Sequence, residues 1–196
     1  MATYQAIAAT GAAILGLLKA ARPKDGFDNA QFLLYQSSDF QNPMDEGISL
    51  YLYHVAVNTT RRSRQPRIGP DGRRYRAPLP VDLRYLLVPW AKSATKQQQL
   101  LGWSMRVLEN TPILSSSLLN HYSTEPETFA PTETVELISE PISLQEIVNI
   151  WDAFKPSLQV SVAYVARMIL IDSDEEIPDA SPVQTRVFDF GKEPVR

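Results

Sequence analysis

The stretch ISLYLYHVAVN at residues 48–58 sets the strongest limit on the fold of this chain. Its side chains alternate with the period of a β-strand. One side carries Ile48, Leu50, Leu52, His54 and Ala56, and the other carries Tyr51, Tyr53, Val55 and Val57. Both sides are largely apolar, so we expect an inner strand that is covered on both faces. With 196 residues, 44% of them hydrophobic, the chain can bury the core that such a strand requires.

Other periodic segments lie on both sides of this strand. We expect strands at 31–36, 81–91, 134–140 and 158–171, the last with Val160, Val162, Tyr164, Ala166 and Met168 on one face. The strands at 48–58 and 81–91 would pair as antiparallel neighbours. We expect an N-terminal helix that ends before Pro23, a helix at 93–110, and a helix that begins at a Ser143–Glu146 capping box and stops at Pro156. Residues 39–47 are predicted to be a loop, and PILSSSLLN can add a turn or two of helix.

The composition changes after Ile171. The segment DSDEEIPDASPVQ has five acidic residues, two prolines and no basic residue, which is typical of a flexible linker. TRVFDF (185–190) then regains a strand-like pattern. We therefore predict a domain over 1–171 and an acidic linker with a C-terminal extension over 172–196. The extension is either a disordered terminus or an arm that adds a strand to a partner, through Val183, Thr185, Val187, Phe188 and Phe190.

The residues that carry most protein chemistry are scarce. There is no cysteine, which excludes disulfides, thiolate catalysis and Cys-ligated zinc. Ser93 and Lys96 match the S-x-x-K motif of serine acyl-enzymes, but its companion motifs are absent and Ser93 is explained as a helix N-cap. Gly102–Arg106 resembles a nucleophile elbow only in part, and His54 is expected to be a hydrogen-bonded core residue. We predict no catalytic residue, no metal site and no cofactor.

The N-terminal segment is apolar, which raises the possibility of a membrane span or a signal peptide. Its uncharged run from Ala6 to Leu18 is 13 residues, too short to cross a bilayer. Its positive charges follow the apolar run, whereas a signal peptide carries them before it. We expect an ordinary buried helix, no membrane insertion, and a protein that is made and folded in the cytoplasm.

The arginines are concentrated in TTRRSRQPRIGPDGRRYRAP, residues 59–78. Seven of the 13 arginines lie there: Arg61, Arg62, Arg64, Arg67, Arg73, Arg74 and Arg76. With Asp71 the segment carries +6, so the remainder of a chain of net charge −3 carries −9. Three interpretations remain open: a solvated loop, a loop ordered by an acidic protein partner through guanidinium–carboxylate pairs, and a nucleic-acid-binding loop. The absence of lysine and of a stacking series of aromatic residues disfavours the third.

The segment IVNIWDAFKPSLQVSVAYVARMILID (147–172) carries a resemblance to a known family. It combines a helix with Trp151, then Pro156, then a strand from Leu158 to Arg167. Other elements follow the same order as in that family: LLKAARP, ISLYLYHVAVN with a basic loop after it, PLPVDLRYLLVPWA, QQQLLGWSMRVLENTPIL and ETVELISEP. Over residues 3–172 the chain resembles the tail-terminator, or cap, proteins of extracellular contractile injection systems, which are phage-tail-like particles.

The resemblance implies an α/β (α+β) fold, with a small, mostly antiparallel sheet flanked by helices, that assembles as a six-fold ring. It implies a structural cap that ends the inner tube, contacts the last sheath layer and has no enzymatic activity. The implied partners are further copies of the chain, the tube protein and the sheath protein, in a particle released from the cell. Within this picture the seven arginines would meet the tube or sheath or line the lumen, and residues 183–190 would pair with a sheath subunit. The alternatives are a nucleic-acid-binding module that uses the Arg61–Arg76 loop, and a small hydrolase that uses Ser93.

Overall fold

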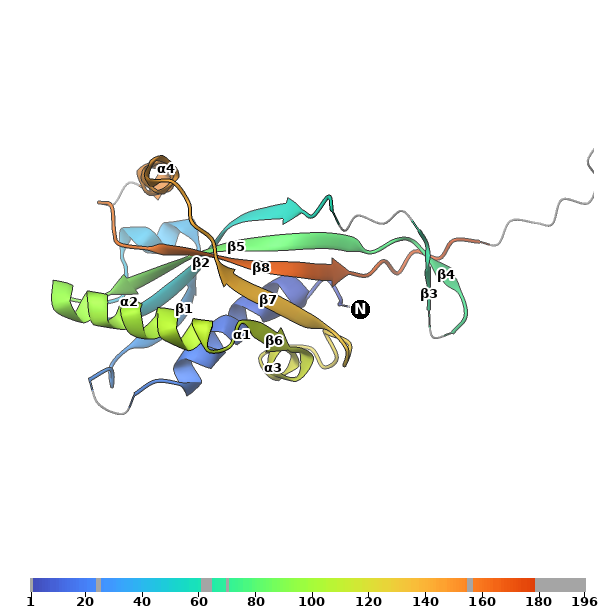
Figure 1. The fold of residues 1–196 in the computed structure, drawn as a ribbon, viewed down its shortest axis with the longest axis horizontal. Coiled ribbons are helices and arrows are strands. Elements are labelled where there is room, and N and C mark those ends of the chain that lie inside the picture. Colours follow the sequence, from blue (N-terminus) through green and yellow to red (C-terminus); the bar gives the residue numbers. More distant parts are fainter. Residues whose placement is uncertain (1, 24–25, 61–64, 70, 155–156, 179–196) are drawn as a thin grey trace, which may run out of the picture.

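A six-stranded sheet forms the centre of the molecule (Figure 1). The computed structural model describes residues 2–23, 26–60, 65–69, 71–154 and 157–178. The strand order is β1-β2-β5-β8-β7-β6, and only the pair of β1 with β2 is parallel. The strands are β1 (Gln31–Tyr35), β2 (Gly47–Val57), β5 (Leu79–Trp90), β6 (Ile113–Ser115), β7 (Thr134–Ser139) and β8 (Val162–Ile171). The expected mostly antiparallel sheet, with 48–58 and 81–91 as neighbours, is therefore confirmed.

Three helices cover one face of the sheet, below it in Figure 1. They are α1 (Ala6–Ala20), α2 (Ala94–Glu109) and α3 (Ser116–His121). Ile14 and Leu18 of α1 are fully buried in the main core, which also contains Leu50 of β2 and Leu83 of β5. Burial of aliphatic side chains at helical spacing against alternating strand residues removes a large apolar area from water, and this holds α1 on the sheet.

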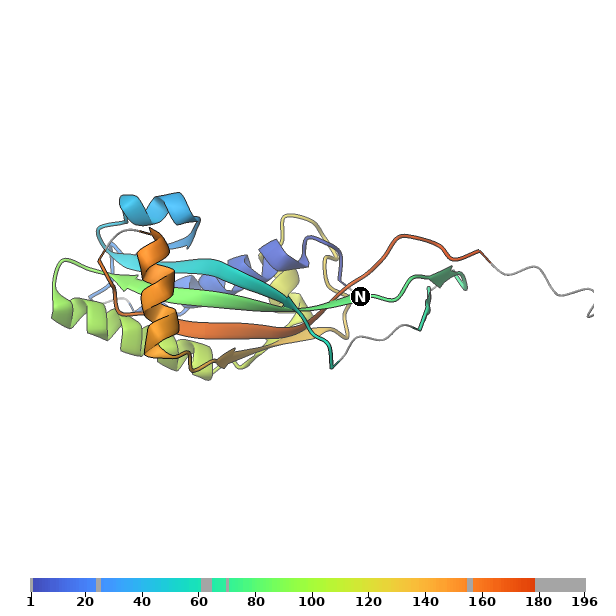
Figure 2. The ribbon, with the colours of Figure 1, turned by 90° about the horizontal axis from the view of Figure 1, so that it is seen from above.

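The opposite face carries a smaller, aromatic core under α4 (Leu144–Phe154) and a short 3-10 helix, η1 (Ser37–Gln41). Figure 2 shows α4 lying across the strands. Phe40 of η1 is buried between Trp90 of β5 and Trp151 and Phe154 of α4. Part of the segment expected to be a loop at 39–47 is thus a helical turn, because Phe40 anchors it. Both faces of the first half of β2 are covered, as its apolar pattern predicted.

The helix starts follow the sequence signals closely. The Ser143 hydroxyl accepts a hydrogen bond from the amide of Glu146 (3.2 Å), and the Glu146 carboxylate accepts one from the amide of Ser143 (2.8 Å). This is the predicted capping box, and it satisfies two amides that the first turn leaves unpaired. Ser93 caps α2 by accepting from the amide of Lys96. Both cap predictions are confirmed.

The expectation that His54 is a core residue is wrong, and a bulge explains why. The pairing of β2 with β5 shifts between Leu52 and His54. The extra residue reverses the inward and outward alternation beyond it, so His54 turns to the exposed side and bonds the Arg84 guanidinium instead.

A second irregularity changes the predicted face of β8. This strand begins at Val162, so Val160 lies outside it and is exposed. Its pairing with β5 shifts around Asp82, whose carboxylate accepts a hydrogen bond from the amide of Met168 at 3.1 Å. Met168 has a φ of 67° and is exposed, and Ile169 takes the core position. The single face predicted from Val160 to Met168 is therefore correct only in its middle.

The segment after α2 folds more compactly than its sequence suggested. Pro112 is followed by the edge strand β6 and then by the single-turn helix α3. The predicted extra turn of helix is confirmed, while strand β6 was not predicted. In the ranges that the structure describes, no helix is long and apolar enough to cross a membrane.

A narrow extension leaves the body beyond the ends of β2, β5 and β8 (Figures 1 and 2). Its hairpin consists of β3 (Arg67–Ile68) and β4 (Arg74–Tyr75). Residues 172–178 run alongside it after β8 ends, where the sequence predicted an open linker. We call residues 65–69, 71–78 and 172–178 the tongue.

Candidate interaction surface

The tip of the tongue is a tight turn that its glycines and Asp71 define. The amide of Gly72 donates to the carbonyl of Gly69 (3.0 Å), and the amide of Gly69 donates to the carbonyl of Arg73 (2.8 Å). Gly72 has a φ of 79°, which glycine adopts without strain. One oxygen of Asp71 accepts from the amide of Arg73 (3.1 Å) and the other from the Tyr75 hydroxyl (2.7 Å). The turn predicted at 70–72 is confirmed in its described residues.

The acidic segment lies beside β4 and pairs with it through an antiparallel bridge. The amide of Arg76 donates to the carbonyl of Glu175 (3.0 Å), and the amide of Ile177 donates to the carbonyl of Arg74 (2.7 Å). Tyr75 and Glu176 form the antiparallel bridge between these two bonds. Residues about one hundred positions apart in the chain thus form one small β-ribbon. An acidic segment of the same chain thus lies beside the arginine loop.

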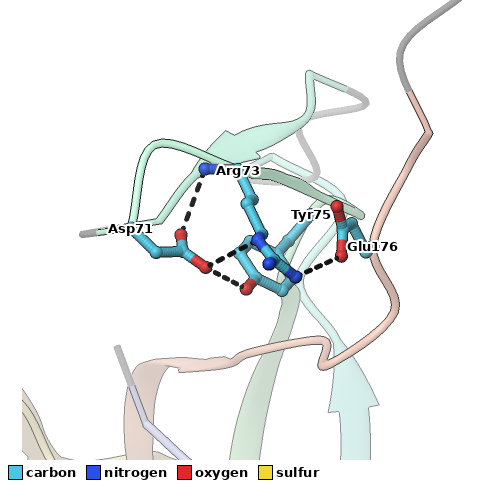
Figure 3. Close-up of polar contacts among 4 residues, drawn as sticks. All are labelled: Asp71, Arg73, Tyr75 and Glu176. Carbon is cyan, nitrogen blue, oxygen red and sulfur yellow. Dashed lines mark hydrogen bonds and ion pairs between the residues drawn. The ribbon is translucent and has the colours of Figure 1, made fainter.

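Ion pairs join the same two segments. The Arg73 guanidinium lies 3.0 Å from a carboxylate oxygen of Glu176 (Figure 3), and that of Arg76 lies 2.7 Å from Glu175. These pairs are exposed to solvent, so they select the pairing of the two segments more than they stabilise the protein.

The base of the tongue is less exposed. The guanidinium of Arg67 lies 3.2 Å from Asp172, and both side chains are largely shielded from solvent. The same guanidinium lies over the ring of Tyr75, 5.0 Å from its centroid. Burial raises the pKa of Asp172, and the positive charge of Arg67 opposes this rise. Arg67 therefore fixes the point at which the tongue leaves the body.

The hydrogen-bond network at the tip shifts the pKa of its members. The Tyr75 hydroxyl, followed by the amide of Arg73, holds the pKa of Asp71 below its usual range. The same hydrogen bond raises the pKa of Tyr75, because ionisation would remove the donated proton. Glu176 raises the pKa of Arg73. These directions agree with the geometry of Figure 3, in which the four side chains converge.

The seven arginines singled out in the sequence therefore differ in their surroundings. Arg67, Arg73 and Arg76 pair with carboxylates of 172–178. Arg74 is exposed, and within the described ranges it has no ion pair. Arg61, Arg62 and Arg64 lie outside the described residues, as do the candidate strand residues Val183, Thr185, Val187, Phe188 and Phe190.

The pairing changes the electrostatic character of the loop. Residues 61–76 carry +6, and the four carboxylates of 172–178 reduce the charge of the combined segments to +2. Residues 1–60 and 77–171 contain nine basic and fourteen acidic side chains, and so carry −5. A nearly neutralised ribbon on an acidic body is poorly suited to a polyanion.

Sequence reasoning missed a second polar cluster, which lies under the start of α4. A cavity of about 530 Å³ is lined by Tyr53, His54, Arg84, Glu140 and neighbouring residues. Arg84 forms a two-point contact with Glu140, with N–O distances of 3.0 and 2.8 Å, and bonds His54 at 3.3 Å. The guanidinium is thus occupied by residues of its own chain. The exposed end of β2 past the bulge contributes Tyr53 and His54 to this cavity. No local sequence pattern predicts such a cavity.

The hydrolase alternative finds no support at Ser93. Its hydroxyl accepts the α2 cap bond, while the ammonium of Lys96 lies 2.7 Å from Glu46. The Lys96 side chain is thereby engaged by Glu46 and not by the Ser93 hydroxyl. Gly102–Arg106 lies within α2, where the strained turn of a nucleophile elbow does not occur.

Comparison with known proteins identifies the family. The model of the Pvc16 N-terminal domain family matches residues 9–185, so the chain belongs to that family. No curated protein sequence matches significantly.

Two solved structures share the fold at 18% identity. One is the sheath/tube terminator, in the extended state, of the extracellular contractile injection system PVC. It has a TM-score of 0.61, with 96% of this chain and 64% of that chain covered. The other is the tube-terminating cap of the anti-feeding prophage, with a TM-score of 0.58 and coverages of 90% and 58%. The chain thus spans less than two thirds of each of these proteins. The resemblance to terminator proteins predicted from the sequence is confirmed.

Proposed function

We propose that this chain is a structural terminator of a contractile injection particle, which ends the inner tube and anchors the last sheath layer. The observation that carries the proposal is that nearly the whole chain takes the fold of a sheath/tube terminator. Family membership over residues 9–185 supports it independently. No enzymatic step is assigned, since Ser93 and Lys96 are engaged in capping and ion pairing.

The test is removal of the protein from cells that produce such particles. Without it, tubes should lose their uniform length and sheaths should detach or contract prematurely at one end, as seen by electron microscopy. The intact chain should restore both features. Particles of normal length and stability without the protein would exclude the terminator role.

We further propose that the chain acts as a six-fold ring, with tube and sheath protein as its other partners. A closed ring of identical head-to-tail contacts matches the symmetry that a tube end requires. Native mass spectrometry of the purified protein, alone and with tube ends, measures the number of copies. A protein that stays monomeric in both samples would refute the ring. The same proposal places the protein in assembled particles that are released from the cell that makes them.

The arginine loop is proposed to contribute to docking on these partners. Replacement of Arg61, Arg62, Arg64, Arg67, Arg73, Arg74 and Arg76 by alanine should weaken capping while the circular dichroism of the body stays unchanged. Since three of these arginines hold the tongue together, the matched variant retains Arg67, Arg73 and Arg76 and replaces only the other four. Unaltered capping by both variants would remove the loop from the mechanism.

The C-terminal strand is proposed as an arm that adds to a sheath subunit through residues 183–190. Its alternating apolar pattern is the requirement for strand addition to a sheet edge. A chain truncated after Asp179 keeps the tongue residues and removes the arm. It should assemble tubes but lose the attachment of the sheath. Particles that still assemble and contract normally would contradict this proposal.

A further inference from the structure

The tongue has two faces of different character. In an antiparallel pair, opposite residues lie on the same face and successive residues alternate. Arg67 lies opposite Tyr75, and Tyr75 lies opposite Glu176, so these three share one face. Arg73 and Asp71 join them through the contacts of Figure 3. This first face is occupied by its own hydrogen bonds and ion pairs.

The second face is different. Ile68 lies opposite Arg74, and both point away from the first face. The side chain of Ile68 is 72% exposed, and Arg74 is exposed without an ion pair within the described ranges. The tongue thus pairs three of its arginines internally and presents a fourth beside an exposed aliphatic group. Such a combination of an apolar contact and a free guanidinium fork is typical of residues that anchor an interface.

The charge of Arg74 indicates the kind of partner surface that the second face of the tongue can bind. A free guanidinium pairs best with a carboxylate, and residues 1–60 and 77–171 carry a net −5. Exposed carboxylates of the body with no ion pair in the described part of the chain include Glu109, Glu127 and Asp152. Because the tongue projects clear of its own body, the acidic body that it can reach is that of a neighbour (Figures 1 and 2).

We infer that the Ile68–Arg74 face of the tongue docks on the acidic body of a second copy of this chain. The contact is head-to-tail, because donor and acceptor are different surfaces, and such contacts close into rings. The inference rests on one part of the proposed function, namely that copies of this chain lie next to one another in a ring. It assigns Arg74 to the contact between copies, whereas Arg67, Arg73 and Arg76 build the tongue.

The experiment uses the absence of cysteine from the chain. Ile68→Cys provides a unique attachment site for a benzophenone photo-crosslinker. A mixture of ¹⁵N-labelled and unlabelled full-length protein is irradiated, both purified and in assembled particles, and cross-linked peptides are identified by mass spectrometry. The expected product joins residue 68 of one copy to residues within 1–60 or 77–171 of another. Attachment only within one copy, only to tube or sheath protein, or to no protein at all would overturn the inference.

A charge reversal tests the second anchor. Arg74→Glu should weaken self-association by about tenfold or more in sedimentation at low salt, since an attraction becomes a repulsion. Added salt should reduce the difference. Arg196→Glu makes the same charge change outside both the tongue and residues 1–60 and 77–171, and it should leave the association constant within about twofold. Equal behaviour of the two variants would overturn the inference. If the purified protein associates as expected but never joins particles, the terminator proposal fails while this inference stands.

Discussion

The aromatic core under η1 gives the sharpest test of how the second face of the sheet is held. Phe40 is 1% exposed. Its ring stacks on Phe154 at 4.2 Å with an interplanar angle of 6°, and meets Tyr51 and Trp151 edge-on at 5.4 and 5.5 Å. Phe40→Ala removes the ring from the centre of this cluster. We expect it to lower the free energy of unfolding by about 3–4 kcal/mol, in the range of buried Phe→Ala substitutions.

Equilibrium denaturation in urea measures this loss. Tryptophan fluorescence reports on the cluster through Trp90 and Trp151, and far-UV circular dichroism reports on the whole fold. The two transitions should coincide if α4 and η1 unfold together with the sheet. Tyr4→Ala truncates an aromatic side chain that is 72% exposed, and it should change stability by less than about 0.5 kcal/mol. A loss below about 1 kcal/mol for Phe40→Ala would refute the claim that this ring fastens η1 to the body.

Two further predictions concern single hydrogen bonds. Ser143 holds the pKa of Glu146 below its usual value, so the capping stabilisation is present above that usual value and is lost as the pH falls through the lower folded pKa. Ser143→Ala should therefore flatten the acid side of a plot of melting temperature against pH, and an unchanged slope would contradict this. The buried Ser49 hydroxyl accepts from the indole N–H of Trp90 at 2.8 Å. Ser49→Ala leaves that donor unsatisfied and should cost about 1–3 kcal/mol in urea denaturation, against less than about 0.5 kcal/mol for the exposed Ser117→Ala.

The parts of the fold that the sequence predicted correctly are those with a local cause. The capping box at Ser143 acts within four residues, and the alternation of Val135 and Leu137 acts within one strand. Such signals survive folding because tertiary contacts reinforce them. The parallel pairing of β1 and the short strand β6 depend on distant partners, and these were not predicted. The helical turn at Phe40 was also missed, although Gln36 and Asp39 cap it locally.

The wrong prediction for His54 shows that one inserted residue is enough to make a periodic pattern misleading. The bulge after Leu52 lies in the pairing of β2 with β5, and no glycine or proline of β2 marks its position. Beyond it, every inward residue becomes an outward one. Since bulges lack a strong local signature, the apolar face predicted for the second half of β2 could not have been corrected from the sequence alone.

The candidate site was identified in the sequence, but its internal partner was not. The basic loop and the acidic segment are both conspicuous, and opposite charge is a reason to pair them. What the sequence does not contain is the geometry that brings residue 176 beside residue 73, since that depends on β5 and β8 being neighbours in the sheet. Once the strands lie side by side, the segments that leave them must run together.

This pairing also decides how the arginine cluster should be interpreted. A loop of +6 alone suggests a polyanion as the partner. Residues 61–76 together with 172–178 carry only +2, beside a body of −5, and this combination suggests a protein surface as the partner. Arg67, Arg73 and Arg76 each have a carboxylate of their own chain beside them, so they present less uncompensated charge to a partner than Arg74 does. The count of arginines is therefore a poor guide to the contact, and the exposed Arg74 is a better one. On such a surface the position of the exposed guanidinium, and not the total charge, determines which partner binds.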